Sequence, residues 1–302
     1  MKKTLMVIAL FVVTITAQQL RVISQEEILP GVTGEWNAPK FSSDGSKVFF
    51  TNWNWNGIWQ YDRTSKQTSQ ITADAGSGFD FSISADGSAL LWRTTRIEPA
   101  TRERIQTIKM KQLNSRATEQ ILAEGETVSA PVFEAGSPAF INGGTLHKNS
   151  SRAANMPVFL GIENEKIQLL VNGSQQTFDP YGSGSYIWVS ISPDGNSVLG
   201  YEMRKGIFIA SLDGTIKKEL GTNDSPTFSH DGRFIIAADT RDNGQVITSS
   251  DLIISAADGS YQFNLTSSPD VIELYPYSSP TKNEVVYVTS TGKLFILSYE
   301  VK

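Results

Sequence analysis

Short apolar segments alternate with polar turns along most of the chain, and the pattern is clearest over residues 38–72. This stretch predicts a strand ending at Phe41, strands over 47–51 and 57–61, and a strand ending at Ile71. Four short strands separated by turn signals every 8 to 12 residues or so are typical of one antiparallel sheet. A unit of this kind that repeats along a chain is typical of a β-propeller blade.

The layout returns along the chain, so that six units are predicted in all. The further units begin near Asp80, Ala130, Ile187, Ser225 and Leu274. Turn pairs of Asp and Gly join the first two strands in four units, at Asp44, Asp86, Asp194 and Asp231. Repetition at one position of the unit identifies these aspartates as hairpin turn residues rather than as a carboxylate site. The third unit instead has Ala135-Gly136, and an insert over 143–155 precedes its next strand over 158–162.

Residues 19–24 form a strand-like segment without a hairpin partner, whereas the sixth unit supplies only three strands before the chain ends. Pairing these two parts completes a sixth sheet and removes an open edge. The sequence therefore predicts an all-β fold, a six-bladed β-propeller with four antiparallel strands per blade. In this prediction the N-terminal strand closes the ring by pairing in the last blade.

Four segments carry a family resemblance, namely PKFSSDGSKVFF, SISADGSALLW, SISPDGNSVLG and PTFSHDGRFII. They resemble the PD40, or TolB-like, repeats of WD40-related β-propellers. The resemblance covers residues 18–302, is strong in four units and weak in the third and sixth, and concerns the propeller only. It implies the fold and says little about activity, because propellers host many unrelated functions.

The first 17 residues are typical of a secretory signal peptide. Lys2 and Lys3 precede an apolar run over 5–13, and Ala17 offers a small residue for cleavage. The apolar run is too short to span a bilayer as a helix. We therefore expect a bacterial protein that is exported to the periplasm or secreted, in which residues 18–302 form one propeller domain without a membrane span.

Charge and composition narrow the possible partners. Removing the two lysines of the signal peptide leaves 24 Lys+Arg against 31 Asp+Glu, a net charge of 24 − 31 = −7. This acidic balance argues against nucleic acid as a partner, since such binding needs basic patches. The chain has no cysteine, and His147 and His230 are its only histidines, so thiol catalysis and a site built from several imidazoles are excluded. No cofactor is predicted, although a cation held by oxygen atoms in the central channel would leave no spacing signal.

The candidate site follows from propeller geometry, which brings the loops between second and third strands to one end of the ring together with the connections between blades. The loop over 52–56 contains two tryptophans between asparagines, which could anchor a peptide or stack on a sugar, or could pack between blades. Charged loop residues gather at the same end of the ring. The candidate ligand- or partner-binding residues are Trp36, Asn37, Trp53, Trp55, Arg93, Glu202, Arg204, Asp224, Asp239 and Arg241.

Two functions are compatible with these residues. The favoured hypothesis is a monomeric, non-catalytic module that presents this face to a protein, peptide or cell-envelope partner, because loops of uneven length project from a repetitive frame. The alternative is a propeller that binds or cleaves a glycan, with Trp36, Trp53 or Trp55 as a stacking platform and carboxylates as acid and base. The sequence cannot give the carboxylate separation that glycoside cleavage requires.

Overall fold

The protein is described here by a computed structural model that covers residues 20–31, 34–114, 118–148 and 156–301. These residues form 26 β-strands, and every strand pairing between them is antiparallel. Within this part of the chain, no helix has the length and apolar character needed to cross a membrane. The predicted signal peptide over 1–17 lies outside the described residues.

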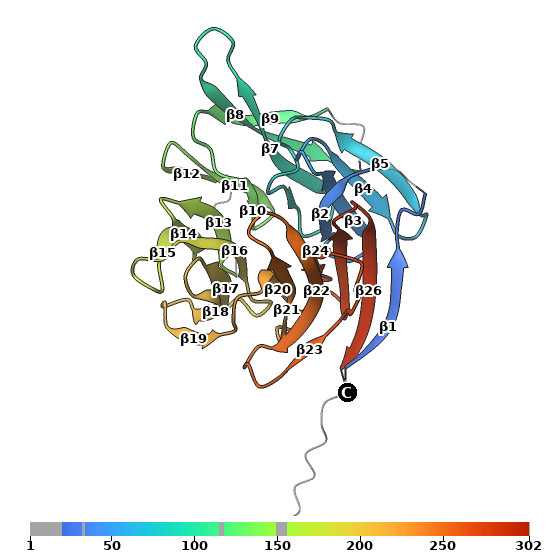
Figure 1. Ribbon diagram of the computed structural model, residues 1–302. Helices are drawn as coiled ribbons and strands as arrows, with labels where there is room; N and C mark the ends of the chain where they lie inside the picture. Colours follow the sequence, from blue (N-terminus) through green and yellow to red (C-terminus); the bar gives the residue numbers. More distant parts are fainter. Residues whose placement is uncertain (1–19, 32–33, 115–117, 149–155, 302) are drawn as a thin grey trace, which may run out of the picture.

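Seven sheets form the blades of a ring (Figure 1). Blade 1 contains β2 (Trp36–Phe41), β3 (Lys47–Asn52), β4 (Ile58–Asp62) and β5 (Gln67–Thr72). Blade 2 contains β6 (Ser82–Ile83), β7 (Ala89–Ile97), β8 (Arg104–Gln112) and β9 (Gln120–Gly125). Blade 3 contains β10 (Val132–Glu134), β11 (Ser137–Asn142) and β12 (Thr145–Lys148).

The second half of the ring follows the same plan. Blade 4 contains β13 (Val158–Glu163), β14 (Lys166–Val171) and β15 (Ser174–Phe178). Blade 5 contains β16 (Tyr186–Ile191), β17 (Ser197–Glu202), β18 (Gly206–Ser211) and β19 (Ile216–Glu219). Blade 6 contains β20 (Asp224–Phe228), β21 (Phe234–Asp242), β22 (Ile247–Ala256) and β23 (Gln262–Asn264). Blade 7 contains β24 (Glu273–Ser278), β25 (Glu284–Thr289), β26 (Leu294–Val301) and β1 (Leu20–Glu27).

The first strand of each blade lies toward the axis of the ring. In blade 1 the strands are ordered β2-β3-β4-β5, so β2 is an edge strand, and it contacts β24 of blade 7. In turn, β24 contacts β20 of blade 6, and β20 contacts β16 of blade 5. We call β2, β6, β10, β13, β16, β20 and β24 the inner strands.

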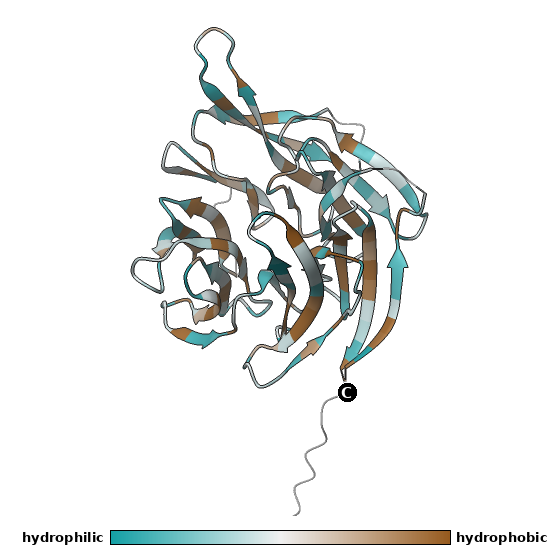
Figure 2. Ribbon diagram, viewed as in Figure 1, coloured by the Kyte–Doolittle hydropathy of each residue, from teal (hydrophilic) through white to brown (hydrophobic). Residues whose placement is uncertain are grey.

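Apolar side chains between neighbouring blades form the core. Seven clusters of buried residues occur, one at each boundary between blades. At the boundary of blades 7 and 1, for example, Val48 and Phe50 pack with Val286 and Val288, all four fully buried. Apolar residues accordingly concentrate in the strands, and hydrophilic residues in turns and outer strands (Figure 2). Each sheet therefore depends on both of its neighbours to bury its faces.

The first and last strands of the described chain share blade 7. β1 pairs with β26 from Leu20, opposite Val301, to Glu27, opposite Phe295. The sheet order β1-β26-β25-β24 makes β1 the outermost strand, and its side chains are largely exposed. The two ends of the chain are thus held side by side by backbone hydrogen bonds (Figure 1).

The all-β propeller class predicted from the sequence is confirmed, but the prediction of six four-stranded blades is wrong. The segment interpreted as the third unit forms two three-stranded sheets, blades 3 and 4. Residues 158–162 begin a new blade instead of continuing the third unit, and β14 (Lys166–Val171) is the middle strand of that blade. Leu160 and Leu170 of blade 4 pack against Ile141 of blade 3, so the two sheets have a boundary cluster of their own.

A substitution at one boundary tests the role of these clusters. Leu297 is fully buried between blades 6 and 7, and Leu297→Ala is expected to lower the free energy of unfolding by about 2–5 kcal/mol in urea denaturation. Ile121 lies on an outer strand with 66% of its surface exposed, and Ile121→Ala is expected to change the free energy by about 0.5 kcal/mol or less. Equal losses in the two variants would contradict the assignment of the core to the blade boundaries.

Candidate functional site

The loops between second and third strands lie at the same end of the ring as the connections between blades. In blade 1 the Trp53 amide donates to the Glu35 carbonyl (2.9 Å), and the Gly78 amide donates to the Trp55 carbonyl (2.9 Å). These bonds join the loop between β3 and β4 to the segments that lead into β2 and β6. We call this end of the ring the mouth face.

Two long hairpins make the mouth face uneven. β7 and β8 continue as a paired ribbon to a tip at residues 98–103, and this ribbon projects beyond the other blades (Figure 1). β21 and β22 form a second extended ribbon with its tip at residues 243–246. Loops of unequal length on a packed frame are the usual place for recognition residues in proteins.

A strained backbone position recurs in five blades. Each instance is a residue other than glycine with φ between 43° and 55°, in or two residues before the inner strand: Ala38, Asp80, Trp188, Ser225 and Tyr275. In four of these blades the pairing of the inner strand shifts register at this position, which marks a β-bulge. Bulges re-aim side chains, and strained non-glycine residues cluster at functional sites. The bulges therefore mark the mouth-face end of the inner strands as the place to look for a site.

Trp36 and Asn37 belong to the packing between blades. The half-buried Trp36 ring packs edge-on against Phe50 (ring centroids 5.0 Å apart) and against Trp59 (5.2 Å). Asn37 is 1% exposed, and its side-chain oxygen accepts a hydrogen bond from the Ala38 amide (2.8 Å). The structure thus places neither residue as an open platform.

Trp53 and Trp55 each pair with an aromatic ring of a neighbouring blade. Trp53 meets Tyr275 of β24 edge-on, with ring centroids 6.3 Å apart. Trp55 meets Phe79 edge-on at 5.5 Å, and Phe79 keeps 46% of its surface exposed. Both tryptophans are half-buried, so they retain accessible surface while they bridge blades.

Glu202 and Arg204 form a local unit that fixes the mouth face of blade 5. The Glu202 carboxylate is 1% exposed and accepts hydrogen bonds from the backbone amide of Arg204 (2.9 Å), from Nε of Arg204 (3.3 Å) and from the amide of Ser185 (3.4 Å). Arg204 also donates to the carbonyl of Ser183 (2.7 Å). Burial raises the pKa of Glu202, but these hydrogen bonds outweigh it and the pKa is lowered overall.

Arg93 helps to fix the mouth face between blades 2 and 3. Its guanidinium group donates to the carbonyl of Val128, which precedes β10. Burial lowers the pKa of Arg93, and the charge of Asp80 opposes this effect. Arg93 therefore connects two blades and is within the electrostatic influence of Asp80, the positive-φ residue before β6 of blade 2.

Asp239 and Arg241 lie together on the β21–β22 ribbon. Their side chains approach to 3.7 Å, and the Arg241 side chain is 75% exposed. An ion pair this exposed contributes little to stability. The pair is available at the surface, but its charges already compensate each other.

Asp224 differs from the other carboxylates of the site because it has no ion-pair partner among the described residues. It begins the inner strand β20 and is half-buried. Burial raises the pKa of Asp224, the nearby charge of Asp242 raises it further, and a hydrogen bond with the Thr240 side chain opposes both effects. The carboxylate is thus held at the mouth face in an environment that disfavours its charge.

Three aromatic residues lie on strands that contact β20, the strand of this carboxylate, and the sequence analysis did not identify them. Burial raises the pKa of Tyr201, and the charge of Asp224 raises it further; both effects act in the same way on Tyr275. The Trp188 ring packs edge-on against Tyr201 at 5.3 Å, and Trp188 is 37% exposed. The structure therefore brings predicted Asp224 together with Trp188, Tyr201 and Tyr275, and Tyr275 links this group to Trp53.

For two of these residues, the sequence contains a signal in their distance from the turn of the first hairpin. Trp188 and Tyr275 each stand six residues before the turn position that corresponds to Asp44 in blade 1, as does Ala38. An alignment of the repeats on their turns would have shown the equivalence. It would not have shown a bulge, because a bulge is a property of strand register.

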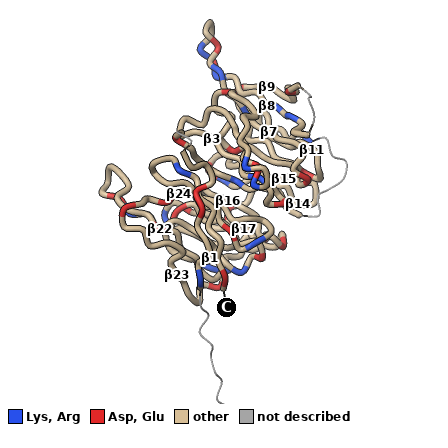
Figure 3. Tube along the Cα trace, turned by 90° about the vertical axis from the view of Figure 1, so that its right-hand side faces the viewer, with Lys and Arg blue, Asp and Glu red and all other residues tan. Residues whose placement is uncertain are grey.

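The described residues contain no group of three or more His, Cys, Asp and Glu side chains that could hold a metal ion. His147 lies on β12, exposed, with its ring stacked on Phe140 at 5.3 Å. Basic and acidic residues are interspersed along the trace in the view of Figure 3.

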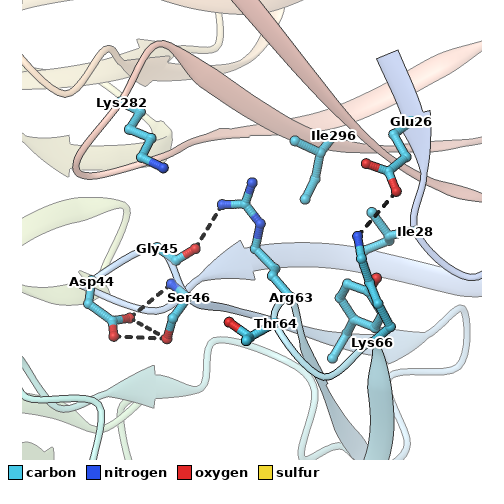
Figure 4. Close-up of a pocket in the computed structure, with 11 residues that line it drawn as sticks. Glu26, Ile28, Asp44, Gly45, Ser46, Arg63, Thr64, Lys66, Lys282 and Ile296 are labelled. Carbon is cyan, nitrogen blue, oxygen red and sulfur yellow. Dashed lines mark hydrogen bonds and ion pairs between the residues drawn. The ribbon is translucent and has the colours of Figure 1, made fainter. Parts of the chain in front are cut away.

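Two cavities lie at the opposite end of the ring, beside the Asp-Gly turns. One of about 340 Å³ opens between blades 7 and 1 (Figure 4), where Arg63 donates to the carbonyl of Gly45 (2.8 Å) and pairs with Glu284 (2.9 Å). Lys66 at the same cavity pairs with Glu26 (3.2 Å). The other cavity, about 430 Å³, occupies the equivalent place between blades 5 and 6. The same gap thus recurs at two blade boundaries, and the charges in the first are largely paired within the protein.

The sequence matches no protein-family model and no curated protein. Solved structures share the fold. The β-propeller domain of Cps50 (Swd1) from Myceliophteria thermophila superimposes with a TM-score of 0.59 and 12% identity, over 92% of this chain and 99% of that chain. TolB from Acinetobacter baumannii gives a TM-score of 0.50 and 18% identity, over 76% of this chain and 53% of that chain. An oligogalacturonate lyase from Vibrio parahaemolyticus gives a TM-score of 0.50 and 12% identity, over 86% of this chain and 76% of that chain.

These likenesses define the class of the protein, a β-propeller that shares its fold with TolB and with a WD40-type domain. At identities of 18% and below they show the fold alone. The chain spans about half of the length of the TolB structure, at 53%.

The buried Glu202 carboxylate gives a prediction about acid stability. Because the pKa of Glu202 is lowered in the folded protein, its contribution to stability is present above the unfolded-state pKa, about 4.3, and is lost as the pH falls through the folded-state value. Glu202→Gln is expected to lower the free energy of unfolding by about 1–3 kcal/mol near pH 7, since it removes a charged acceptor from three hydrogen bonds.

Urea denaturation at about pH 7 and about pH 3 measures this difference, which is expected to shrink at the lower pH. Glu165→Gln changes an exposed carboxylate in the turn between β13 and β14 and serves as the matched control. A Glu202→Gln deficit that is as large in acid as at neutral pH would show that the charge of Glu202 does not stabilise the fold.

Proposed function

We propose that the protein is an exported β-propeller that binds a protein, peptide or cell-envelope partner through the mouth face, without catalysing a reaction. The observation that carries the proposal is the combination of accessible aromatic pairs with an uncompensated carboxylate on a rigid frame, with Trp53, Tyr275 and Asp224 at its centre. Aromatic anchors of this kind dominate binding at protein interfaces.

The frame itself supports a recognition role. The mouth face is assembled from loops whose backbones are fixed by hydrogen bonds, such as the Asn56 side-chain oxygen that accepts from the Gly76 amide (2.9 Å). A loop fixed in this way loses little conformational freedom on binding, which favours affinity. TolB and the Swd1 propeller domain share this fold, which is compatible with the proposed recognition role.

Export is part of the proposal and rests on the sequence of residues 1–17, with residues 18–302 as one propeller domain that acts as a monomer. The proposed binding needs no cofactor. The more accessible of the predicted residues are Trp53, Trp55, Asp224, Asp239, Arg241 and Arg204, and the side chain of Arg204 is 68% exposed. Trp36, Asn37, Arg93, Glu202 and Arg204 hold that face in place.

Carbohydrate recognition is the second candidate. It is favoured by the exposed ring surface of Trp188 and by the half-buried Trp53, which could stack on sugar rings. The oligogalacturonate lyases among the structures with this fold are compatible with such a role. Cleavage is less well supported, because the buried Glu202 carboxylate is already engaged by hydrogen bonds from its own neighbours.

A paired binding experiment tests the proposal. The purified protein is immobilised and used to capture proteins from a cell-envelope extract, and in parallel it is applied to a glycan array. We expect a specific protein partner whose capture is reduced at least about tenfold by Trp53→Ala, since truncation of a hot-spot anchor costs about 2 kcal/mol or more. Binding to a glycan that is lost in Trp53→Ala, without any captured protein, would overturn the proposal.

The matched control is Ile162→Ala, which removes an apolar side chain with 41% exposure near the turn between β13 and β14 at the opposite end of the ring. This variant is expected to capture the partner as the unmodified protein does. Loss of capture in Ile162→Ala alone would place the binding surface at the other end.

A further inference from the structure

We propose that the mouth face over blades 5 to 7 binds a cationic side chain, lysine or arginine, of the protein partner, held by Asp224 and by the rings of Trp188, Tyr201 and Tyr275. We call these four residues the aromatic-acid site. This inference rests on the proposed function and specifies the chemistry by which the partner is recognised.

The fold delivers the four residues from adjacent strands. Trp188 lies on the inner strand β16 and Tyr201 on its neighbour β17, whereas Asp224 begins β20 and Tyr275 lies on β24. β20 contacts β16, β17 and β24, so the aspartate stands between the two groups of aromatic residues. Trp188 and Tyr275 occupy the bulge position of their strands, with φ of 51° and 52°.

The charges around the site are not balanced. Asp224 has no ion pair within the described part of the chain, and Asp242 places a second negative charge nearby. Arg204 is engaged by Glu202 and by a backbone carbonyl, and Arg241 lies against Asp239. Arg204 and Arg241 are therefore engaged by their own neighbours, and Lys205 in the β17–β18 turn is exposed and forms no ion pair with Asp224 among the described residues. A cationic side chain of a bound partner would supply the counter-charge of Asp224.

The aromatic rings favour a cation over a neutral ligand. A lysine or arginine side chain placed against the face of a Trp or Tyr ring is attracted by the ring quadrupole, and the attraction increases where water is excluded. Trp188 offers such a surface with 37% exposure, beside Tyr201 at 5.3 Å. A neutral sugar could stack on the same rings, but it would leave the charges of Asp224 and Asp242 uncompensated.

The cost of the unpaired carboxylate gives an independent readout. Burial and Asp242 raise the pKa of Asp224 in the folded protein, while the hydroxyl of Thr240 opposes this, and the charge of Asp224 in turn raises the pKa of Tyr201 and of Tyr275. Because the pKa of Asp224 is raised on folding, the protonated carboxyl stabilises the fold relative to the ionised one. This stabilisation is complete below the unfolded-state pKa, about 3.9, and is lost as the pH rises through the folded-state value. Ionised Asp224 therefore destabilises the free protein at neutral pH, and Asp224→Asn is expected to raise the melting temperature.

The probes are blocked tripeptides with Lys, Arg, Glu or Gln between two glycines, and tetramethylammonium. Binding is followed near pH 7 by two-dimensional NMR of the tryptophan indole NH groups of the full chain. We expect the Lys and Arg peptides and tetramethylammonium to shift the Trp188 signal in a saturable way, with no saturable shift from the Glu and Gln peptides. Asp224→Asn is expected to weaken binding of the Lys peptide by about tenfold, in the range of a cation held by rings and a carboxylate.

For Trp188→Ala, binding is followed through the remaining indole signals. This variant is expected to bind the Lys peptide about tenfold more weakly than the unmodified protein does. Glu165→Gln, at the far end of the ring, is the control for loss of one negative charge and is expected to bind as the unmodified protein does. Equal binding of the Lys and Glu peptides, or unchanged Lys binding in Asp224→Asn, would overturn the inference. So would saturable binding of a neutral oligosaccharide that is lost in Trp188→Ala when the Lys peptide does not bind.

Failure of this inference can be distinguished from failure of the proposed function. If Trp53→Ala loses a captured partner and Asp224→Asn retains it, the mouth face binds the partner but does not recognise it through a cationic side chain. If the partner is retained in both variants, the mouth face is not the binding surface. Loss in both variants, with a higher melting temperature for Asp224→Asn, supports both proposals, because a stabilised variant has not lost binding by unfolding.

Discussion

Apolar packing between neighbouring blades is the constraint on which the rest of the structure depends. Each sheet buries its two faces against two neighbours, so the seven boundary clusters can form together only in a complete ring. Blade 7 has a special place because it contains both the first and the last strand of the described chain. The positions of the mouth-face loops, and thus of Trp53 and Asp224, follow from this packing.

Non-glycine residues in the left-handed region recur on or just before the inner strands at the mouth face, close to the half-buried Asp224. Five blades have a non-glycine residue in the left-handed region at this position, four of them at a β-bulge, and two of these residues, Trp188 and Tyr275, belong to the aromatic-acid site. Asp224 is half-buried there without a counter-charge. Features that cost stability often occur where they serve binding, and their coincidence here supports the proposed binding role of the mouth face.

Much of the fold was predictable from the sequence because an Asp-Gly pair marks the turn of the first hairpin in four blades. It failed at blades 3 and 4, where β10 and β11 are joined at Ala135 and β13 and β14 at Asn164-Glu165, so no repeated turn pair marked the boundary. For the candidate site, loop reasoning predicted Trp53 and Asp224. It could not separate these from Trp36, which packs between blades, because burial depends on contacts between strands that are distant in sequence.

The pairing of the first strand with the last is the most direct test of this account. Ser24 and Ser298 are opposed across β1 and β26, and the chain has no other cysteine to interfere with a double cysteine variant. We predict that Ser24→Cys/Ser298→Cys forms an intramolecular disulfide in high yield under mild oxidation, measured by intact mass, and that the crosslink raises the melting temperature. A yield no higher than that of the mismatched pair Ser24→Cys/Thr289→Cys would contradict the shared sheet and, with it, the closed ring.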